Sequence, residues 1–282
     1  MADLFIIAQH RTGSTLLKNM LDAHPAIIMA FDEMNLFEPL RNNTLDRLIY
    51  KGVDTPDGVV DAIYAGQVYG TFWKRFSESG IDRKALLEAF GKKTSLAADD
   101  VLRQILRLQK ERGGVNHSGA KYPVHVARLD WLLQHFPRSR VLFLFRNPLD
   151  VVASKVNDEA TRTRKQKSLI YQFGIHYFTL FYFCLEFRRA CRVYQMHRGD
   201  VLMVQYESLV RAPEEVLRGI CEYLGVCFHP AMLFATGKNS SYTGHAFGAP
   251  VSDSIDRYQD RLSKFDQWLI RLFTQKLYKA LM

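Results

Sequence analysis

The first 21 residues constrain the fold of this chain more than any other stretch. Residues 4–8 (Leu-Phe-Ile-Ile-Ala) form a short apolar run, which is typical of a buried β-strand. Residues 11–15 form a polar turn around Gly13. The apolar residues that follow recur at helical spacing: Leu16, Leu17, Met20 and Leu21. We therefore expect a strand that passes through a tight turn into a helix beginning near Ser14, as in the core of an α/β protein.

A turn of this kind can hold an anion. The first backbone N–H groups of a helix have no partner within the helix, and the helix dipole is positive at that end. Gly13 lets the backbone approach a phosphate closely. Ser14 and Thr15 add hydroxyl donors, and Arg11 adds a cation. The full Gly-x-x-x-x-Gly-Lys-Ser/Thr pattern of a P-loop is absent, so a purely structural strand-to-helix turn is the alternative interpretation.

Composition narrows the class of ligand without choosing one. The chain has 282 residues, 48% of them hydrophobic, which is enough for one large α/β domain or two small ones with a packed core. Its formal net charge of +9 favours anionic partners such as nucleotides, nucleic acid, acidic glycans or a membrane surface.

Four cysteines form no Cys-x-x-Cys pair, and no histidine cluster completes a metal-ligand pattern. We expect reduced, mostly buried thiols and no metal.

The sequence predicts neither a leader nor a membrane span. The first predicted strand begins almost at Met1, which leaves no room for a signal peptide. The longest aromatic run, residues 169–187, is interrupted by Gln172, His176 and Glu186. We interpret this run as a buried helix whose aromatic side chains belong to the core. These features predict a cytoplasmic location.

An acidic loop and a helical block follow the first helix. Residues 31–39 come after a second short strand, and in an open parallel sheet such loops lie at the carboxyl edge. Glu33 of this loop could therefore face a ligand held by the first turn. Residues 42–119 have mostly helical patterns, and we interpret them as an insertion that covers the site on the substrate side.

A second strand–helix unit brings another arginine to the same edge. Residues 119–124 predict a short strand that carries Lys121, and residues 140–145 form a fully apolar strand. The latter runs directly into Arg146 and a helix that begins near Pro148, with Ser154 about two helical turns further on. An arginine and a serine that converge there could hold a second phosphate.

The remaining patterns complete the predicted fold. Residues 201–206 form another buried strand, and residues 213–224 and 262–281 are amphipathic helices. Residues 161–167 are strongly basic, which is typical of a solvated surface; an anion-attracting lid is the alternative. Residues 238–250 are rich in Gly, Ser and Asn and predict a functional loop.

Together these motifs resemble the sulfotransferases that use 3′-phosphoadenosine 5′-phosphosulfate (PAPS). Residues 11–17 are similar to the family's 5′-phosphosulfate loop, and residues 146–154 to its 3′-phosphate motif. Residues 204–225 are similar to the strand–helix unit that follows. The resemblance runs in order from residue 4 to about residue 225, with a divergent middle. It implies a single domain over residues 1–282, with a P-loop-like, three-layer α/β fold whose central, mainly parallel sheet is flanked by helices.

The resemblance also implies donor contacts, residue by residue. The 5′-phosphosulfate would be held by the first turn and the start of the helix: Arg11, Thr12, Gly13, Ser14, Thr15 and Leu16. Arg146 and Ser154 would hold the 3′-phosphate, and Tyr206 would add a further contact to the donor. Residues 237–244 take the place of the family's C-terminal Arg-Lys-Gly loop, whose pattern they do not match.

Catalytic roles follow from the same resemblance. Glu33 matches the general base of the tyrosylprotein, bacterial and carbohydrate-type enzymes. Lys121 matches a lysine near the transferring group, and Arg11 would also stabilise the negative charge that develops on that group. The phenol and steroid branch uses a histidine two places after this lysine, where this chain has Pro123. His125 is displaced by two positions, so it is the weaker candidate for the base.

The implied activity is in-line transfer of a sulfuryl group from PAPS to a hydroxyl or amine, with release of adenosine 3′,5′-bisphosphate (PAP). The acceptor could be a small molecule, a glycan, a lipid or a peptide; nucleic acid and metal ions are not expected to take part. A P-loop nucleotide kinase is one alternative, although no lysine follows Gly13 before Lys18. A non-catalytic polyanion-binding protein is the other, although no nucleic-acid motif is present.

Overall fold

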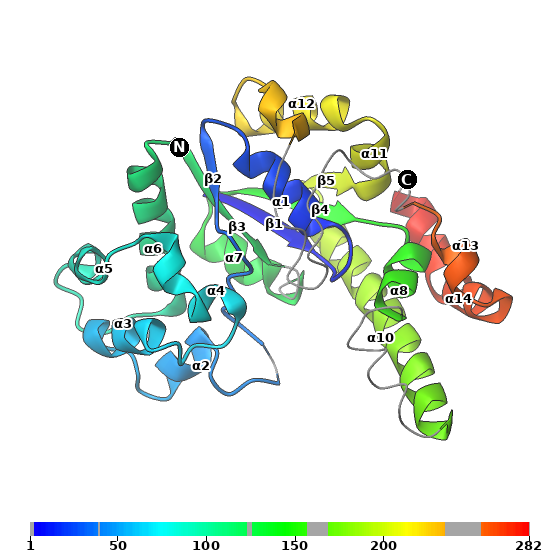
Figure 1. The fold of residues 1–282 in the computed structure, drawn as a ribbon, viewed down its shortest axis with the longest axis horizontal. Helices are drawn as coiled ribbons and strands as arrows, with labels where there is room; N and C mark the ends of the chain where they lie inside the picture. Colours follow the sequence, from blue (N-terminus) through cyan, green and yellow to red (C-terminus); the bar gives the residue numbers. More distant parts are fainter. Residues whose placement is uncertain (1–2, 39, 123–125, 157–168, 235–254, 282) are drawn as a thin grey trace.

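A parallel sheet forms the centre of the molecule. The computed structural model describes residues 3–38, 40–122, 126–156, 169–234 and 255–281. Its five strands have the order β2-β3-β1-β4-β5, and every neighbouring pair is parallel (Figure 1). The strands are β1 (Asp3–Ala8), β2 (Ile27–Met29), β3 (His117–Tyr122), β4 (Arg140–Phe145) and β5 (Leu202–Gln205). The predicted α/β class with a mainly parallel central sheet is confirmed.

Each face of the sheet has its own hydrophobic core, because successive side chains of a strand point to opposite faces. Phe5 and Ile7 of β1 pack into one core, and Leu4 and Ile6 into the other. All four side chains are at most 1% exposed. A strand covered on both faces must be apolar at every position, which explains the continuous apolar runs in β1 and β4.

Helices from distant parts of the chain cover the two faces. One face carries α1 (Ser14–Asp22) and α12 (Pro213–Leu224), with α11 (Tyr206–Arg211) between β5 and α12. The opposite face carries α7 (Leu129–His135) and the end of α10 (Leu169–Met196). Figure 1 shows these layers above and below the sheet. The three-layer arrangement matches the prediction.

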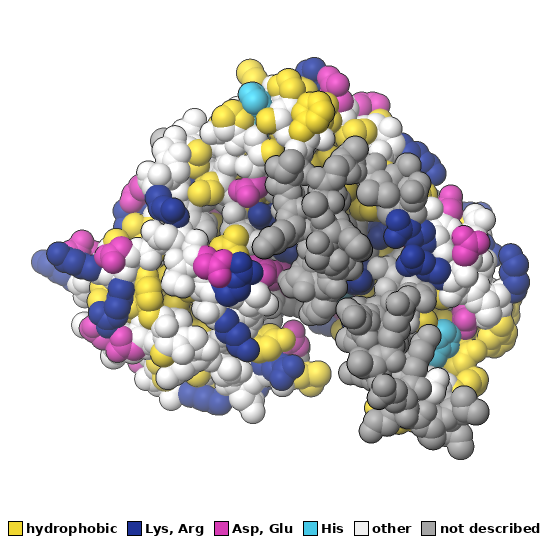
Figure 2. Space-filling model, in the orientation of Figure 1, with side chains coloured by type: hydrophobic (Ala, Val, Ile, Leu, Met, Phe, Trp, Pro, Cys, Tyr) yellow, Lys and Arg dark blue, Asp and Glu magenta, His cyan; other side chains and the backbone are white. Residues whose placement is uncertain are grey.

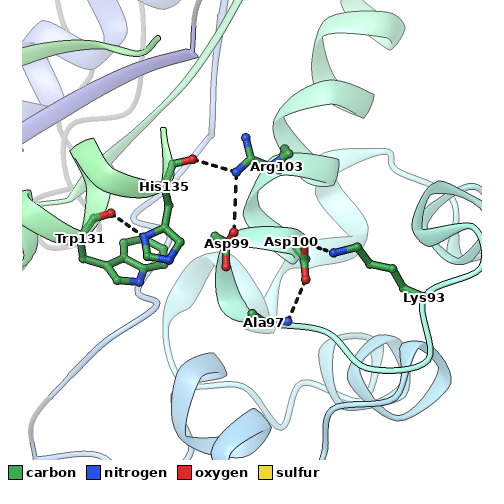
Figure 3. A network of polar contacts seen from close by, with 7 residues as sticks. All are labelled: Lys93, Ala97, Asp99, Asp100, Arg103, Trp131 and His135. Carbon is green, nitrogen blue, oxygen red and sulfur yellow. Dashed lines mark hydrogen bonds and ion pairs between the residues drawn. The ribbon is translucent and has the colours of Figure 1, made fainter. Parts of the chain in front are cut away.

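The segment between β2 and β3 is helical, as the sequence indicates. Its helices are α2 (Leu45–Tyr50), α3 (Pro56–Tyr64), α4 (Thr71–Lys74), η1 (Phe76–Ser79), α5 (Arg83–Phe90) and α6 (Ala98–Gly113). Figure 3 shows how α6 is held. Asp100 accepts a hydrogen bond from the N–H of Ala97 at 3.0 Å, while Arg103 donates to the carbonyl of His135 at 2.8 Å. The insertion is therefore joined to α7 and through it to the sheet.

Four of the helices that follow β4 form the remaining side of the molecule: α8 (Pro148–Val156), α10, α13 (Tyr258–Arg261) and α14 (Lys264–Leu281). Two further 3₁₀ turns lie elsewhere, η2 (Val126–Arg128) before α7 and η4 (Pro230–Phe234) after α12. In Figure 1, α10 extends well beyond the sheet, with α8 and α14 beside it. None of the helices, within the ranges that the structure describes, is long and apolar enough to cross a membrane.

The expectation that the aromatic residues of α10 are buried in the core is wrong for part of the helix. Phe173 is 67% exposed, Phe178 71% and Phe181 46%. Helix α10 has 28 residues, so it is about 42 Å long, whereas a six-residue strand spans only about 20 Å. Only the second half of α10, which includes Phe187 and Tyr194, can pack on the sheet.

Candidate functional site

The carboxyl edge of the sheet gathers the predicted site residues. All five strands are parallel, so the segments that follow them meet at one edge. The turn at residues 9–13 follows β1, and the loop with Glu33 follows β2. Lys121 lies at the end of β3, Arg146 follows β4 and Tyr206 follows β5.

The turn after β1 is built to expose backbone N–H groups. Arg11 and Gly13 both have positive φ angles, 69° and 94°. Left-handed residues alternating with ordinary ones turn successive N–H groups toward one point, which creates an anion-binding nest. Helix α1 begins at Ser14 with no acidic residue in its first turn, so no carboxylate of its own competes for that end.

Two side-chain hydrogen bonds hold this turn in place. Thr12 Oγ1 donates to the carbonyl of Gln9 at 2.7 Å and closes the turn on itself. Gln9 Nε2 donates to the carbonyl of Phe183 in α10 at 2.9 Å. Both contacts are buried, and the second one places α10 directly beside the turn. Thr12 is thus part of the scaffold of the turn.

Tyr206 fills the space between the turn and Arg146. A Cβ atom on Gly13 would lie 2.3 Å from the Cδ2 atom of the Tyr206 ring, so the ring packs directly on the glycine. The guanidinium carbon of Arg146 lies over the Tyr206 ring, 4.3 Å from the ring centroid, in a cation–π geometry. Gly13 is therefore required both by its backbone angle and by this ring.

The two predicted phosphate sites are in direct contact with each other. Arg146 Nη1 donates to the carbonyl of Arg11 at 3.1 Å. Arg11 Nε in turn donates to Ser154 Oγ in α8 at 3.2 Å. Arg11, Arg146 and Ser154 thus form one connected set, although Arg11 and Ser154 are 143 positions apart in the sequence.

A second set joins Glu33, Lys121 and the start of α1. Lys121 Nζ donates to Thr15 Oγ1 at 2.8 Å and forms an ion pair with Glu33 Oε1 at 3.3 Å. Lys121 is only 5% exposed, while the Glu33 side chain is 27% exposed. The buried ammonium therefore connects the acidic loop to the anion-binding turn, and the carboxylate keeps access to solvent.

Sequence reasoning missed two carboxylates around Arg146. Glu207 accepts a hydrogen bond from the N–H of Asn147 at 2.8 Å. Asp150 accepts from the N–H groups of Asp256 and Tyr258 at 3.0 and 3.2 Å. Burial raises the pKa of both carboxyl groups, and the positive charge of Arg146 opposes that shift. Asp150 had a visible signal as an acidic residue in the first turn of a helix, whereas Glu207 had none.

His10 is a third group that sequence reasoning left without a role. It lies at the tip of the turn between Gln9 and Arg11. Burial lowers its pKa, and Glu33 acts in the opposite direction; Lys155 and Lys121 add to the lowering. The imidazole is therefore within electrostatic range of Glu33, Lys155 and Lys121.

Several predicted features lie outside the described residues. They are His125, the basic segment 161–167, the segment 237–244 and the loop 238–250. Their predicted roles stay predictions.

Comparisons with known proteins agree with this geometry. A family model described as "Sulfotransferase family" matches residues 3–230. A search of curated proteins finds no match. Among solved structures, the sulfotransferase domain of the Synechococcus PCC 7002 olefin synthase is 21% identical with a TM-score of 0.57; the match covers 96% of this chain and 93% of that one. A sulfotransferase domain from the curacin biosynthetic pathway is 18% identical with a TM-score of 0.61, and 96% of each chain is covered. At these identities the two structures establish the shared fold.

Proposed function

The chain belongs to the sulfotransferase family, whose enzymes use PAPS, and from that premise we propose how its own residues carry the reaction. The proposed activity is transfer of a sulfuryl group from PAPS to a hydroxyl or amine of an acceptor, with Glu33 as general base. The observation that carries the proposal is the contact between Arg146 and Arg11. A single nucleotide with phosphates at both ends needs two cationic sites that adjoin, and these two do.

The residues at the sheet edge fit the donor. The nest at residues 11–13 and the first turn of α1, with Ser14, Thr15 and Leu16, suit the 5′-phosphosulfate. Arg146 and Ser154 suit the 3′-phosphate, because a guanidinium and a hydroxyl both donate to phosphate oxygens. Tyr206 holds the Arg146 guanidinium from beneath through its ring. When bound, PAPS supplies the sulfuryl group and a bisphosphorylated leaving group.

The negative charge that develops on the donor oxygens is stabilised by three sets of donors: Arg11, Lys121 and the first N–H groups of α1. These groups are fixed before the reaction begins, so they oppose negative charge on the donor oxygens without costly rearrangement. Lys121 is held by its contacts to Thr15 and Glu33. Its buried position in the sheet keeps the ammonium at the same place throughout the reaction.

Glu33 is the proposed acceptor of the proton from the attacking hydroxyl or amine. Its Oε1 atom lies 3.3 Å from Lys121 Nζ, and because the carboxylate is partly exposed, an acceptor can approach it from solvent. A correctly placed general base contributes about 10²–10⁴-fold to the rate. No step in this scheme requires a metal ion.

The helical insertion is the proposed wall of the acceptor pocket. Trp73 Nε1 donates to the carbonyl of Asn35 at 2.9 Å, and Phe31 stacks on Phe72 with ring centroids 5.0 Å apart. Both contacts join the insertion to the loop that carries Glu33. We accordingly treat residues 1–282 as one domain, with residues 42–119 on the acceptor side. The acceptor class stays open among small molecules, glycans, lipids and peptides, and a cytoplasmic location stays a prediction.

The geometry does not favour the kinase alternative. Lys18 is the first lysine after Gly13, and its ammonium is buried and paired with Asp22 in the same helix at 3.1 Å. It is therefore turned to its own helix instead of a phosphate in the cradle.

A ligand titration tests the proposal against both alternatives. The chain is titrated by calorimetry with PAP, with ATP and Mg²⁺, and with heparin, and PAPS-dependent sulfation is then measured over a panel of acceptors. We expect PAP to bind much more tightly than ATP, with one molecule per chain, and sulfate transfer to at least one acceptor. Preference for ATP would favour the kinase, and tight heparin binding without PAP binding would favour the polyanion-binding protein.

A further inference from the structure

Helices α10 and α14 present an apolar surface that the proposed reaction does not use. We define the α10–α14 surface by five exposed side chains: Phe181, Leu185, Phe265, Trp268 and Leu272. Their exposed fractions are 46%, 46%, 56%, 55% and 63%. Apolar side chains are visible over α14 at the lower right of Figure 2. Neighbouring exposed side chains of this size mark an interaction site more often than chance does.

The surface is continuous across the seam between the two helices. Phe265 stacks on Trp268 within α14, with ring centroids 5.8 Å apart. The Phe265 ring also lies 6.3 Å from that of Tyr177 in α10. Further along the seam, Phe181 meets the edge of Phe273 at 5.6 Å. The aromatic side chains of the two helices therefore form one patch.

The fold of the domain does not require this patch. In α14, Ile270 and Thr274 supply the buried stripe, at 0% and 2% exposure. Residues 265, 268 and 272 repeat at i, i+3 and i+7, so they form a second apolar stripe on the outside of the same helix. Large apolar residues exposed at regular spacing cost solubility and need a separate explanation.

The charged residues of the two helices that form the patch are mostly positive. The basic residues of the two helices are Arg188, Arg189, Arg192, Lys264, Arg271, Lys276 and Lys279. Their acidic residues are Glu186, paired with Arg189, and Asp266. Asp266 is 5% exposed and faces inward, where it bonds to His176 and Ser263. The outer face of α14 thus combines aromatic side chains with cations and has no exposed carboxylate.

We propose that the α10–α14 surface binds the face of an anionic lipid bilayer. Aromatic rings suit the boundary between headgroups and acyl chains, and Lys and Arg reach from there to lipid phosphates while their stems stay in apolar surroundings. A second copy of the chain fits less well. A twofold contact would bring the same cations against one another, and protein interfaces are depleted in the lysines that dominate the rim of α14.

Vesicle co-sedimentation of the full chain tests the proposal. Phosphatidylcholine vesicles are compared with vesicles that also contain phosphatidylserine. We expect binding to the anionic vesicles that weakens as salt is raised, and little binding to the neutral ones. Replacing both Phe265→Ser and Trp268→Ser should weaken binding by at least about tenfold, because two aromatic side chains no longer enter the interface. Tyr50→Ser is the matched control, since Tyr50 in α2 is 91% exposed and lies on the insertion.

Two measurements keep the outcome decisive. The melting temperature and PAP affinity of each variant show whether it is folded, since neither substituted side chain belongs to the donor site. Sedimentation velocity shows whether the wild-type chain self-associates. Absence of binding to anionic vesicles, or unchanged binding by the double variant, overturns the proposal. So does a dimer that the same double substitution dissociates, because the surface would then serve a second copy. Vesicle binding and self-association do not depend on the proposed sulfotransferase residues, and the melting temperature alone reports folding if PAP does not bind.

Discussion

Gly13 and Gly52 have nearly the same backbone angle in very different surroundings. Their φ values are 94° and 96°. A Cβ on Gly52 would have no atom within 4 Å, whereas a Cβ on Gly13 would lie 2.3 Å from both Cδ2 and Cε2 of Tyr206. The pair therefore separates two costs of a side chain at these positions. One is the strain of a left-handed backbone, and the other is the collision with the ring.

The expected magnitudes follow from these surroundings. Gly52→Ala should lower the free energy of unfolding by about 1–2 kcal/mol, the strain of an L-residue in the left-handed region. Gly13→Ala should lower it by about 2–5 kcal/mol, because overpacking adds about 1–3 kcal/mol. The displaced ring also supports Arg146, so only Gly13→Ala should weaken PAP binding.

Urea denaturation and calorimetry with PAP measure both effects. The collision is isolated by repeating Gly13→Ala in a Tyr206→Ala background, where only the strain should remain. A coupling energy of about 1–3 kcal/mol between the two substitutions is expected. Equal losses of stability in Gly13→Ala and Gly52→Ala, or no coupling with Tyr206, would refute the contact between the ring and the turn.

Three further substitutions test the site. Arg146→Ala should reduce the free energy of PAP binding by about 1.5–3 kcal/mol, the scale of a charge-assisted hydrogen bond. Calorimetry compares it with Arg138→Ala, a control on the exposed surface. Equal PAP affinities of the two variants would remove Arg146 from the donor site. Glu33→Gln should lower kcat about 10²–10⁴-fold and retain PAP affinity, whereas Glu38→Gln in the same loop should leave kcat unchanged. A normal kcat for Glu33→Gln would exclude Glu33 as the base. Burial raises the folded-state pKa of Glu207 above its unfolded value of 4.5, so the folded state binds more protons and stability falls as pH rises from about 4.5 to that raised pKa. Glu207→Gln keeps the acceptor oxygen but cannot titrate, so its stability should fall less over this pH range, as measured by urea midpoints at a series of acidic pH values. An unchanged dependence of stability on pH would contradict the raised pKa of Glu207.

Local patterns were enough to predict the elements that carry the site. The apolar run of β1, the turn at Gly13 and the periodic residues of α1 are adjacent in the sequence, so short-range rules describe them. The rule that loops of a parallel sheet meet at its carboxyl edge then predicted that Arg11 and Arg146 approach one another. The structure brings them into contact.

Other features depend on tertiary packing that no local pattern contains. Nothing in the sequence around Tyr206 indicates that its ring lies on Gly13, or that the neighbouring Glu207 is buried beside Arg146. The exposure of Phe173 and Phe178 was missed for a similar reason. Aromatic composition predicts burial only where a helix has something to pack against, and α10 is longer than the sheet.

The position of Lys121 shows how backbone register serves chemistry. Side chains of a strand alternate between faces, so a shift of one residue would turn Lys121 away from Thr15 and Glu33. Gly119, two residues earlier, is required in that register: a Cβ there would lie 2.5 Å from the Leu4 carbonyl oxygen and 2.7 Å from the Met29 sulfur. Only glycine lets β1, β2 and β3 come this close at that point. The register that holds the Lys121 ammonium next to the turn proposed to bind the donor is therefore one that only a residue without a side chain at position 119 can accommodate.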